Sequence, residues 1–138
     1  MLADLVNDID CKEDVPLFIG GPVHKERLYY LHTLGNLIPD SVEVSQGVYI
    51  GGDYDVLKEY INAGEPVNGK IRFMVGYSGW EEGQLEKEIA QYDWAVAELK
   101  KLDTLLIDEE DEAWQNVVKS LGSKYKIWTN CPKNVNFN

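Results

Sequence analysis

Hydrophobic residues follow a helical period at the start of the chain and a strand-like pattern soon after it. Apolar positions i, i+3, i+4 and i+7 of the range 2–9 predict a short amphipathic helix that ends near Asp10. The almost unbroken apolar run 15–20 predicts a strand with both faces buried, and the Gly-Gly-Pro that bounds it predicts a sharp turn. The aromatic-rich run 27–33 predicts a second strand.

The middle of the chain has the pattern of a hairpin, a helix and another strand. The alternating runs 42–44 and 48–50 are separated by Ser-Gln-Gly, which predicts a hairpin with a glycine-containing loop. Asp53 precedes residues with one apolar helical face, and we expect it to cap that helix, with Gly64 at its C-terminal end. The apolar run 71–76 predicts a strand.

Two helices and several short strands are predicted beyond that point. Residues 81–92 favour a helix, although Gly83 weakens its first turn. The acidic run 108–112 stands before a second helical pattern that Gly122 closes, and acids at a helix N-terminus favour its dipole. Strand-like composition is found at three places: 94–99, 104–107 and 125–128.

Short strands and helices that interleave in this way favour an α+β fold, or an irregular mixed sheet, over regular βαβ units. With 138 residues, 44% of them hydrophobic, the chain is long enough for one real core and too short for two. No repeat or low-complexity linker divides it. We therefore expect a single domain over residues 1–138.

The excess of acidic over basic residues disfavours nucleic acids and anionic membranes as partners. A net charge of −11 repels phosphate backbones, whereas nucleic-acid affinity rests on basic patches, so we expect no direct nucleic-acid binding. Anionic membrane surfaces are disfavoured for the same reason, and no apolar run approaches a membrane span. The first residues carry no basic stretch ahead of a long apolar one, as a signal peptide would, and we expect a cytoplasmic protein. Cys11 and Cys131 have no metal-ligand spacing and are expected to be free thiols, although a disulfide between them stays open.

Two glycine-containing stretches resemble catalytic motifs incompletely. Residues 64–70 have the spacing of a phosphate-binding loop, but Ile71 follows in place of a hydroxyl and a predicted helix leads into a strand, which is the reverse of the required order. Residues 76–80 (Gly-Tyr-Ser-Gly-Trp) resemble a nucleophile elbow, but Trp80 stands where its second glycine belongs. The structural interpretation is a strand-to-helix turn in which Ser78 caps the helix and Trp80 anchors it in the core.

The only histidines are His24 and His32. They could meet across a hairpin and, with a carboxylate, bind a metal ion, but no third ligand stands at a diagnostic spacing. A structural role for each is favoured, and we predict no metal site and no cofactor. Glutamates of the range 81–88 are expected to form a solvated helix face.

Three stretches together are similar to the AlgH/YqgE family. They are 18–23 (Phe-Ile-Gly-Gly-Pro-Val) with His32 following, 49–53 (Tyr-Ile-Gly-Gly-Asp), and 76–80 with Gly-Gln-Leu-Glu at 83–86. Trp94 and Trp114 follow in the expected order, so the resemblance extends from about residue 2 to 122 and leaves the tail 123–138 outside it.

The resemblance implies an α+β fold with a bent, partly barrel-like mixed sheet flanked by helices, and no established biochemical activity. It also implies further strands ahead of the range 2–9, and the present sequence is either a shortened form or a natural short one. A sheet without those strands would have an exposed edge, so we expect self-association. AlgH gave the family a label as a transcriptional regulator. We find no helix here with Lys or Arg on one face, so a regulatory role would run through protein contacts.

Two functions from different classes follow. The leading one is a non-enzymatic protein-binding or regulatory domain with an unknown protein partner. The alternative is an enzyme that uses His24 or His32 with Glu86 near Ser78, although no complete catalytic set is present. We predict a candidate binding surface that consists of the glycine turns, the two histidines and residues of the range 77–86. Its members are Gly20, Gly21, Pro22, His24, His32, Gly51, Gly52, Tyr77, Ser78, Trp80, Gln84 and Glu86.

Overall fold

The computed structural model describes residues 1–98, 106 and 110–130, and these residues form two units. Residues 1–79 and Leu106 belong to the first unit, and residues 80–98 and 110–130 to the second. Most of the predicted strand 104–107, the start of the acidic run and Cys131 lie outside the described residues. Our expectation of one domain over 1–138 stays a prediction.

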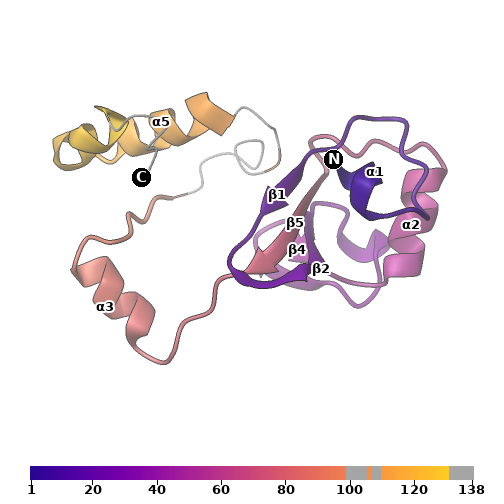
Figure 1. The fold of residues 1–138 in the computed structure, drawn as a ribbon, viewed down its shortest axis with the longest axis horizontal. Helices are drawn as coiled ribbons and strands as arrows, with labels where there is room; N and C mark the ends of the chain where they lie inside the picture. The colour runs from indigo at the N-terminus through magenta and orange to yellow at the C-terminus, as the bar shows by residue number, and fades with distance from the viewer. Residues whose placement is uncertain (99–105, 107–109, 131–138) are drawn as a thin grey trace. The chain divides into compact units, whose positions relative to one another are not determined.

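The first unit contains an open, mixed sheet of five strands in the order β1-β5-β2-β4-β3 (Figure 1). Only β1 and β5 are parallel, and the other neighbours are antiparallel. The strands are β1 Leu17–Ile19, β2 Val23–His32, β3 Val42–Ser45, β4 Val48–Ile50 and β5 Ile71–Tyr77.

The α+β class and the bent sheet are confirmed. Register shifts interrupt β2 between Val23 and Leu28 and the β3–β4 pair between Glu43 and Ser45. Such irregularities bend a strand and increase its twist. The sheet is curled only in part, because β1 and β3 are edges and do not pair with each other.

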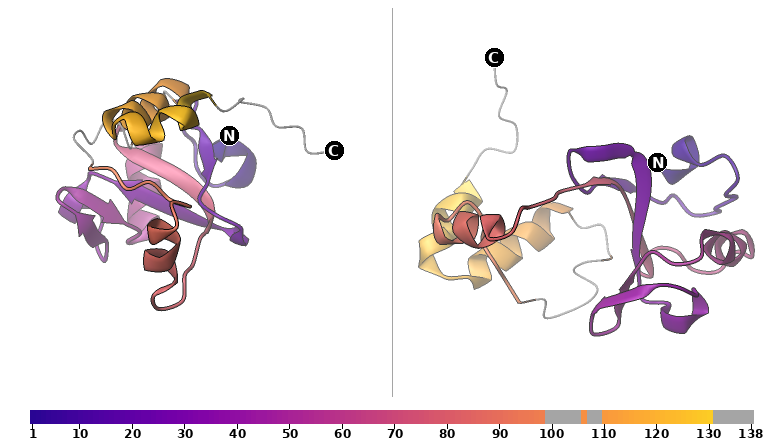
Figure 2. Two further views of the ribbon diagram at one scale, coloured as in Figure 1. Left: turned by 90° about the vertical axis from the view of Figure 1, so that its left-hand side faces the viewer. Right: turned by 90° about the horizontal axis from the view of Figure 1, so that it is seen from below.

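The helices of the first unit, α1 (Leu2–Leu5) and α2 (Tyr54–Asn62), lie on the same side of the sheet, as Figures 1 and 2 show. The predicted caps of α2 are confirmed. The Asp53 carboxylate accepts from the backbone N–H groups of Asp55 and Val56 at 2.9 and 3.2 Å. Gly64 follows the last turn with φ of +81°.

The core of the first unit lies between these helices and the sheet. Phe73 from the middle of β5 is fully buried, and Leu57 and Ile61 from the apolar face of α2 pack in the same cluster. Leu2 and Ile9 bring the N-terminal segment into it. The helical period of the range 2–9 correctly marked Leu2 and Ile9 as core residues, whereas Leu5 is 46% exposed and the helix itself ends at Leu5.

The second unit contains α3 (Gln84–Ala90), α5 (Glu110–Ser120) and a 3₁₀-helix, η2 (Ser123–Asn130). The helix predicted after the acidic run is confirmed as α5, and Gly122 follows it with φ of +97°. Gly83 has φ of +76° and precedes the first residue of α3, so the helix begins later than predicted.

Three predicted strands differ from the structure. β1 is an edge strand and is not buried on both faces, since its Ile19 is 77% exposed. Residues 94–98 form no strand. Residues 125–128 are helical: Tyr125 and Trp128 stand three apart, which places them on one side of a 3₁₀-helix, with ring centroids 5.4 Å apart.

Candidate functional site

His32 is the one buried polar residue of the described core, with no exposed surface. Its Nε2–H donates to the carbonyl oxygen of Gly51 at 3.0 Å, and its Nδ1 accepts from the backbone N–H of Leu34 at 3.2 Å. These two bonds together require the neutral tautomer with the proton on Nε2. Burial lowers the pKa of His32, which keeps the ring neutral. His32 is therefore a structural residue whose two nitrogens are both engaged.

The Gly51–Gly52 turn is held by the residues of β2 that face it. The hydroxyl of Tyr30 donates to the carbonyl oxygen of Gly52 at 2.7 Å, next to the bond from His32 to Gly51. Gly52 has φ of +111°, and a Cβ there would stand 2.7 Å from the Ile38 side chain. Folding alone thus explains this glycine, without a ligand that approaches the backbone.

The turn Gly20-Gly21-Pro22 packs against the end of β5. A Cβ on Gly21 would stand 2.1 Å from the carbonyl carbon of Tyr77, and one on Gly20 would stand 2.5 Å from the oxygen of Gly76. The two backbones could not approach so closely if either glycine carried a side chain. Pro22 is exposed in the turn that joins β1 to β2.

Ser78 belongs to this packing. The prediction that it caps a helix is wrong. Its hydroxyl donates to the carbonyl oxygen of Gly20 at 3.5 Å, and α3 begins only at Gln84, with Gly83 in the cap position. Residues 78–80 have no regular secondary structure, so the nucleophile elbow, which needs a helix directly after the serine, is not formed.

His24 lies at the opposite end of β2 from His32. Val23 pairs with Tyr77 and His32 pairs with Ile71, so the two histidines are at the two ends of the β2–β5 ladder and do not meet across a hairpin. His24 has φ of +50°, its Nδ1 is 2.8 Å from a carboxylate oxygen of Glu26, and its ring stacks on Tyr77. Within the described part of the chain, no group of three His, Cys, Asp or Glu residues is arranged to hold a metal ion.

A hydrogen-bonded cluster in the second unit joins Trp80, Gln84, Glu88 and Trp94. Both indole N–H groups donate to the same oxygen of Glu88, at 3.0 Å from Trp80 and 2.7 Å from Trp94. The side-chain amide of Gln84 donates to the other oxygen at 2.9 Å, and its own oxygen accepts from the backbone N–H of Glu81. One carboxylate thus fixes two tryptophan rings and the first turn of α3. We call these four residues the indole cluster.

The indole cluster lies at the surface. Trp80 is 38% exposed and Trp94 46% exposed, so Trp80 does not anchor the helix in a core. The rings meet nearly edge to face, with centroids 5.6 Å apart and planes at 74°. Hydrogen bonds from Trp80, Trp94 and Gln84 hold the pKa of Glu88 below its usual value, which keeps the carboxylate ionised.

The sequence identified half of this cluster. Trp80 and Gln84 were among the predicted residues, whereas Glu88 and Trp94 were missed as members of a site and Glu86 was chosen in place of Glu88. The i, i+4 spacing from Gln84 points to Glu88, because residues four apart lie on one face of a helix. Glu86 stands two positions from each of them and faces away.

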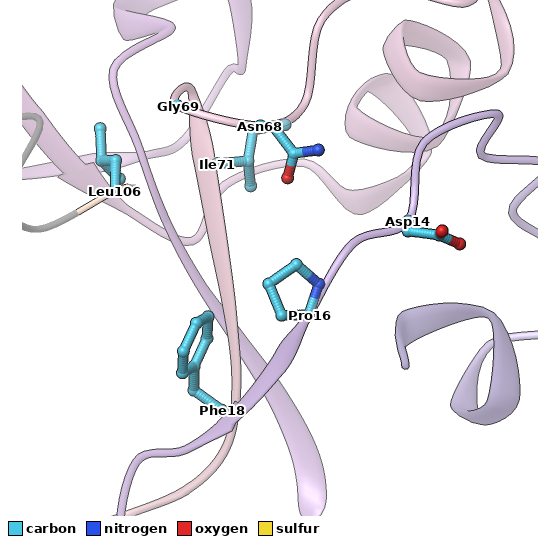
Figure 3. A pocket seen from close by; sticks show the side chains of 7 residues that line it. All are labelled: Asp14, Pro16, Phe18, Asn68, Gly69, Ile71 and Leu106. Atoms are coloured by element: carbon cyan, nitrogen blue, oxygen red, sulfur yellow. The ribbon is translucent and has the colours of Figure 1, made fainter. Parts of the chain in front are cut away.

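Two hollows lie in the first unit. One, of about 430 Å³, opens beside the edge strand β1 and is lined by Phe18, Ile71 and Leu106 (Figure 3). Its one ionisable lining group is Asp14, whose carboxylate points away from Phe18. Among its described lining residues, no nucleophilic side chain accompanies this carboxylate.

The second hollow, of about 570 Å³, lies beside α1 and α2 and is lined mainly by apolar and aromatic side chains, including Leu28, Tyr30 and Tyr54. Glu26 and Gly51 also border it. Burial and a hydrogen bond to Asp8 raise the pKa of Tyr54 to about 12, so its hydroxyl stays protonated. A tyrosine in that state donates a hydrogen bond and does not act as a base.

The candidate residues of the first unit thus do not form one surface. Those of the first unit belong to two sets at opposite ends of β2, and hydrogen bonds and close backbone packing explain most of them. The cluster around Glu88 differs, because it leaves two aromatic rings partly exposed and fixed in orientation.

Comparison with known proteins places the chain in a family. The model of a family described as AlgH-like matches residues 1–126. The chain belongs to the AlgH-like family. The resemblance seen in the sequence is thereby confirmed.

Relatives and solved structures agree with this assignment. A UPF0301 protein of Parabacteroides distasonis is 43% identical to this AlgH-like chain, over 87% of this chain and 61% of its own length. A UPF0301 protein of Bacteroides fragilis is 42% identical, over 96% of this chain and 67% of its own length. The chain therefore spans about two thirds of these relatives. The solution structure of the AlgH protein from Pseudomonas aeruginosa is 25% identical, with a TM-score of 0.62 over 97% of this chain and 72% of that one. Protein DIP2367 from Corynebacterium diphtheriae, at 17% identity and a TM-score of 0.63 over 93% and 68%, shares the fold.

These names describe an uncharacterised family and assign no activity. Among the helices that the structure describes, none is long and apolar enough to cross a membrane.

Proposed function

We propose that this AlgH-like chain is a non-enzymatic binding domain that engages a protein partner through the indole cluster, and that any regulatory role runs through that contact. The observation that carries the proposal is the pair of partly exposed tryptophans whose N–H groups are both fixed by Glu88. Tryptophan is enriched in the residues that dominate binding energy at protein interfaces. Side chains that are already fixed also lose less conformational entropy on binding.

A pull-down with matched variants tests the proposal. Trp80→Ala removes one ring of the pair, and Gln84→Ala removes the amide that helps to hold Glu88. Trp114→Ala is the control, because it removes a tryptophan that is 49% exposed on α5 in the same unit and lies outside the cluster. We expect Trp80→Ala to lose at least tenfold in affinity for a captured partner, and Trp114→Ala to keep it. If both cluster variants retain every partner of the wild-type chain, the indole cluster is not the binding surface.

The enzyme alternative has less support from the geometry. His32 uses both nitrogens in hydrogen bonds to the backbone and is buried, so it has no free nitrogen for a substrate. Ser78 donates to Gly20, and the described contacts of His24 are to Glu26 and Tyr77. Incubation with a serine-reactive fluorophosphonate probe checks this directly, since labelling that Ser78→Ala abolishes would revive the alternative.

Self-association is a further part of the proposal, and the edge strand β3 supports it. All four residues of β3 are exposed, and Val42 and Val44 are 61% and 55% exposed. An edge that carries apolar side chains is a template for pairing with another strand. We expect a dimer or larger species by light scattering at micromolar concentration, and a shift toward the monomer in Val44→Lys.

The control for this measurement is Leu37→Lys, which places the same charge on a residue that is 64% exposed but lies outside the sheet. It should leave the mass unchanged. A monomeric mass for the wild-type chain would count against self-association.

A further inference from the structure

The indole cluster has the geometry and charge of a receptor for a cation. We propose that the corner between Trp80 and Trp94 takes the side chain of an arginine, or of a lysine, from a basic segment of the partner protein. This inference rests on the proposed binding function and specifies the chemistry of the contact.

The first step is the orientation of the two rings. An aromatic ring has a positive edge and a negative face. In the indole cluster the N–H edges of both rings point to Glu88, at 3.0 and 2.7 Å, so the carboxylate already satisfies the polar edges. Each residue is still partly exposed, Trp80 at 38% and Trp94 at 46%, and an indole ring apart from its N–H group is apolar with a negative π face. The two ring planes stand at 74° with centroids 5.6 Å apart, and this nearly edge-to-face arrangement forms a corner.

The second step is the chemistry that fits such a corner. Cations are attracted to the face of an aromatic ring, tryptophan attracts them most strongly, and arginine is the protein cation found there most often. The flat guanidinium also stacks on a ring while its N–H groups stay free to reach a carboxylate. A lysine ammonium fits as a point charge without the stacking.

The third step is the charge around the corner. The segment 80–98 carries one basic residue, Lys87, and six acidic ones, namely Glu81, Glu82, Glu86, Glu88, Asp93 and Glu98. The whole chain has a net charge of −11. Nucleobases would also stack on tryptophan, but their phosphates would be repelled here. A positively charged group is therefore favoured over an anionic or a nucleotide ligand.

The fourth step is an internal example of the same contact. In this unit, the Nζ of Lys124 lies 3.7 Å from the centroid of the Tyr92 ring. Tyr92 is 54% exposed, so a cation from elsewhere in the chain already binds an exposed aromatic face close in sequence to Trp94. The corner between Trp80 and Trp94 offers two such faces and a stronger type of ring.

The chain provides its own controls for the test, because its four tryptophans divide into two inside the cluster and two outside it, Trp114 and Trp128. The indole N–H signals are followed by ¹H–¹⁵N NMR while a capped Gly-Arg-Gly peptide is added at low salt. We expect the signals of Trp80 and Trp94 to shift and saturate, while those of Trp114 and Trp128 stay in place. The same peptide with citrulline, which has the shape of arginine without its charge, should bind at least tenfold more weakly.

Variants separate the contact from a general charge effect. Trp94→Ala should abolish the saturating shift, whereas Trp114→Ala should leave it intact. Equal binding of the citrulline peptide would overturn the cation inference in favour of an apolar contact. Equal shifts of all four indoles would overturn it in favour of a general charge effect. If Trp80→Ala loses the captured partner but neither peptide shifts the pair, the proposed function stands and this inference is wrong.

Discussion

At the scale of single residues, glycines and histidines drew attention as functional candidates, and the structure gives most of them a folding role. Gly21 is required by the close approach of the Tyr77 backbone, and Gly52 by its positive φ and the nearby Ile38 side chain. Such requirements arise from contacts between distant segments, so the sequence shows that a glycine is present without showing why. His32 was predicted to be structural, and its two backbone hydrogen bonds agree with that role.

His32 makes the stability of the first unit depend on pH. Burial lowers its pKa in the folded state below the usual 6.5. Above that value both states are neutral, and the stabilising contribution is complete. As the pH falls below it, the unfolded chain takes up a proton that the folded chain resists, so stability is lost down to the folded pKa. We expect the free energy of unfolding, measured with urea, to be lower at pH 5.5 than at pH 7.5.

Two variants isolate this effect. His32→Asn should be less stable than the wild type at pH 7.5 by about 1–3 kcal/mol, because backbone partners at Gly51 and Leu34 lose their ring contact. It should also lose part of the difference between the two pH values. His24→Asn, which replaces an exposed histidine, should keep that difference. An unchanged difference in His32→Asn would show that other groups cause it.

At the scale of elements, the sequence was most informative where a cap or a turn residue marked a boundary. Asp53 and Gly64 located α2, and the glycine-containing loop located the β3–β4 hairpin. Composition without such signals failed at 94–98 and 125–128, because aromatic residues fit a strand or a helical surface equally well. The indole cluster could be predicted in part, since Gln84 and Glu88 share one face of α3. The position of Trp94 depends on how the chain turns after α3. The sequence pattern of that segment did not show the turn.

The cap of α2 leads to a prediction for one element. Asp53→Ala removes the carboxylate that accepts from the N–H groups of Asp55 and Val56, and it should lower the free energy of unfolding by about 0.5–2 kcal/mol. Asp53→Asn keeps a side-chain oxygen at that place and should cost much less. Urea unfolding followed by circular dichroism measures both. Equal losses in the two variants would point to the charge of Asp53, and not to its hydrogen bonds, as the stabilising feature.

At the scale of the whole molecule, the fold class and the family were both predictable, because ordered motifs along a chain are more specific than any one of them. Our expectation of one cooperative unit stays a prediction. The first unit has a sheet and a buried core around Phe73, whereas the described residues of the second form helices and none of them belongs to that core cluster. Our expectation of a single domain requires both units to unfold together.

The chain contains separate probes for its two units. All four tryptophans, Trp80, Trp94, Trp114 and Trp128, lie in the second unit, and both histidines lie in the first. Tryptophan fluorescence therefore reports one unit, and the His32 ring proton signal in NMR reports the other. If the chain is one domain, urea should give the same midpoint by both probes, since coincident transitions are the mark of two-state unfolding.

Asp53→Ala makes this comparison decisive, because the substitution lies in the first unit alone. In one cooperative domain the lost cap lowers the midpoint of both probes equally, although no tryptophan is near it in sequence. In two independent units the midpoint of the His32 signal falls and that of the fluorescence stays where it was. The second outcome would contradict the single-domain prediction, and the indole cluster would then belong to a unit whose stability does not depend on the sheet.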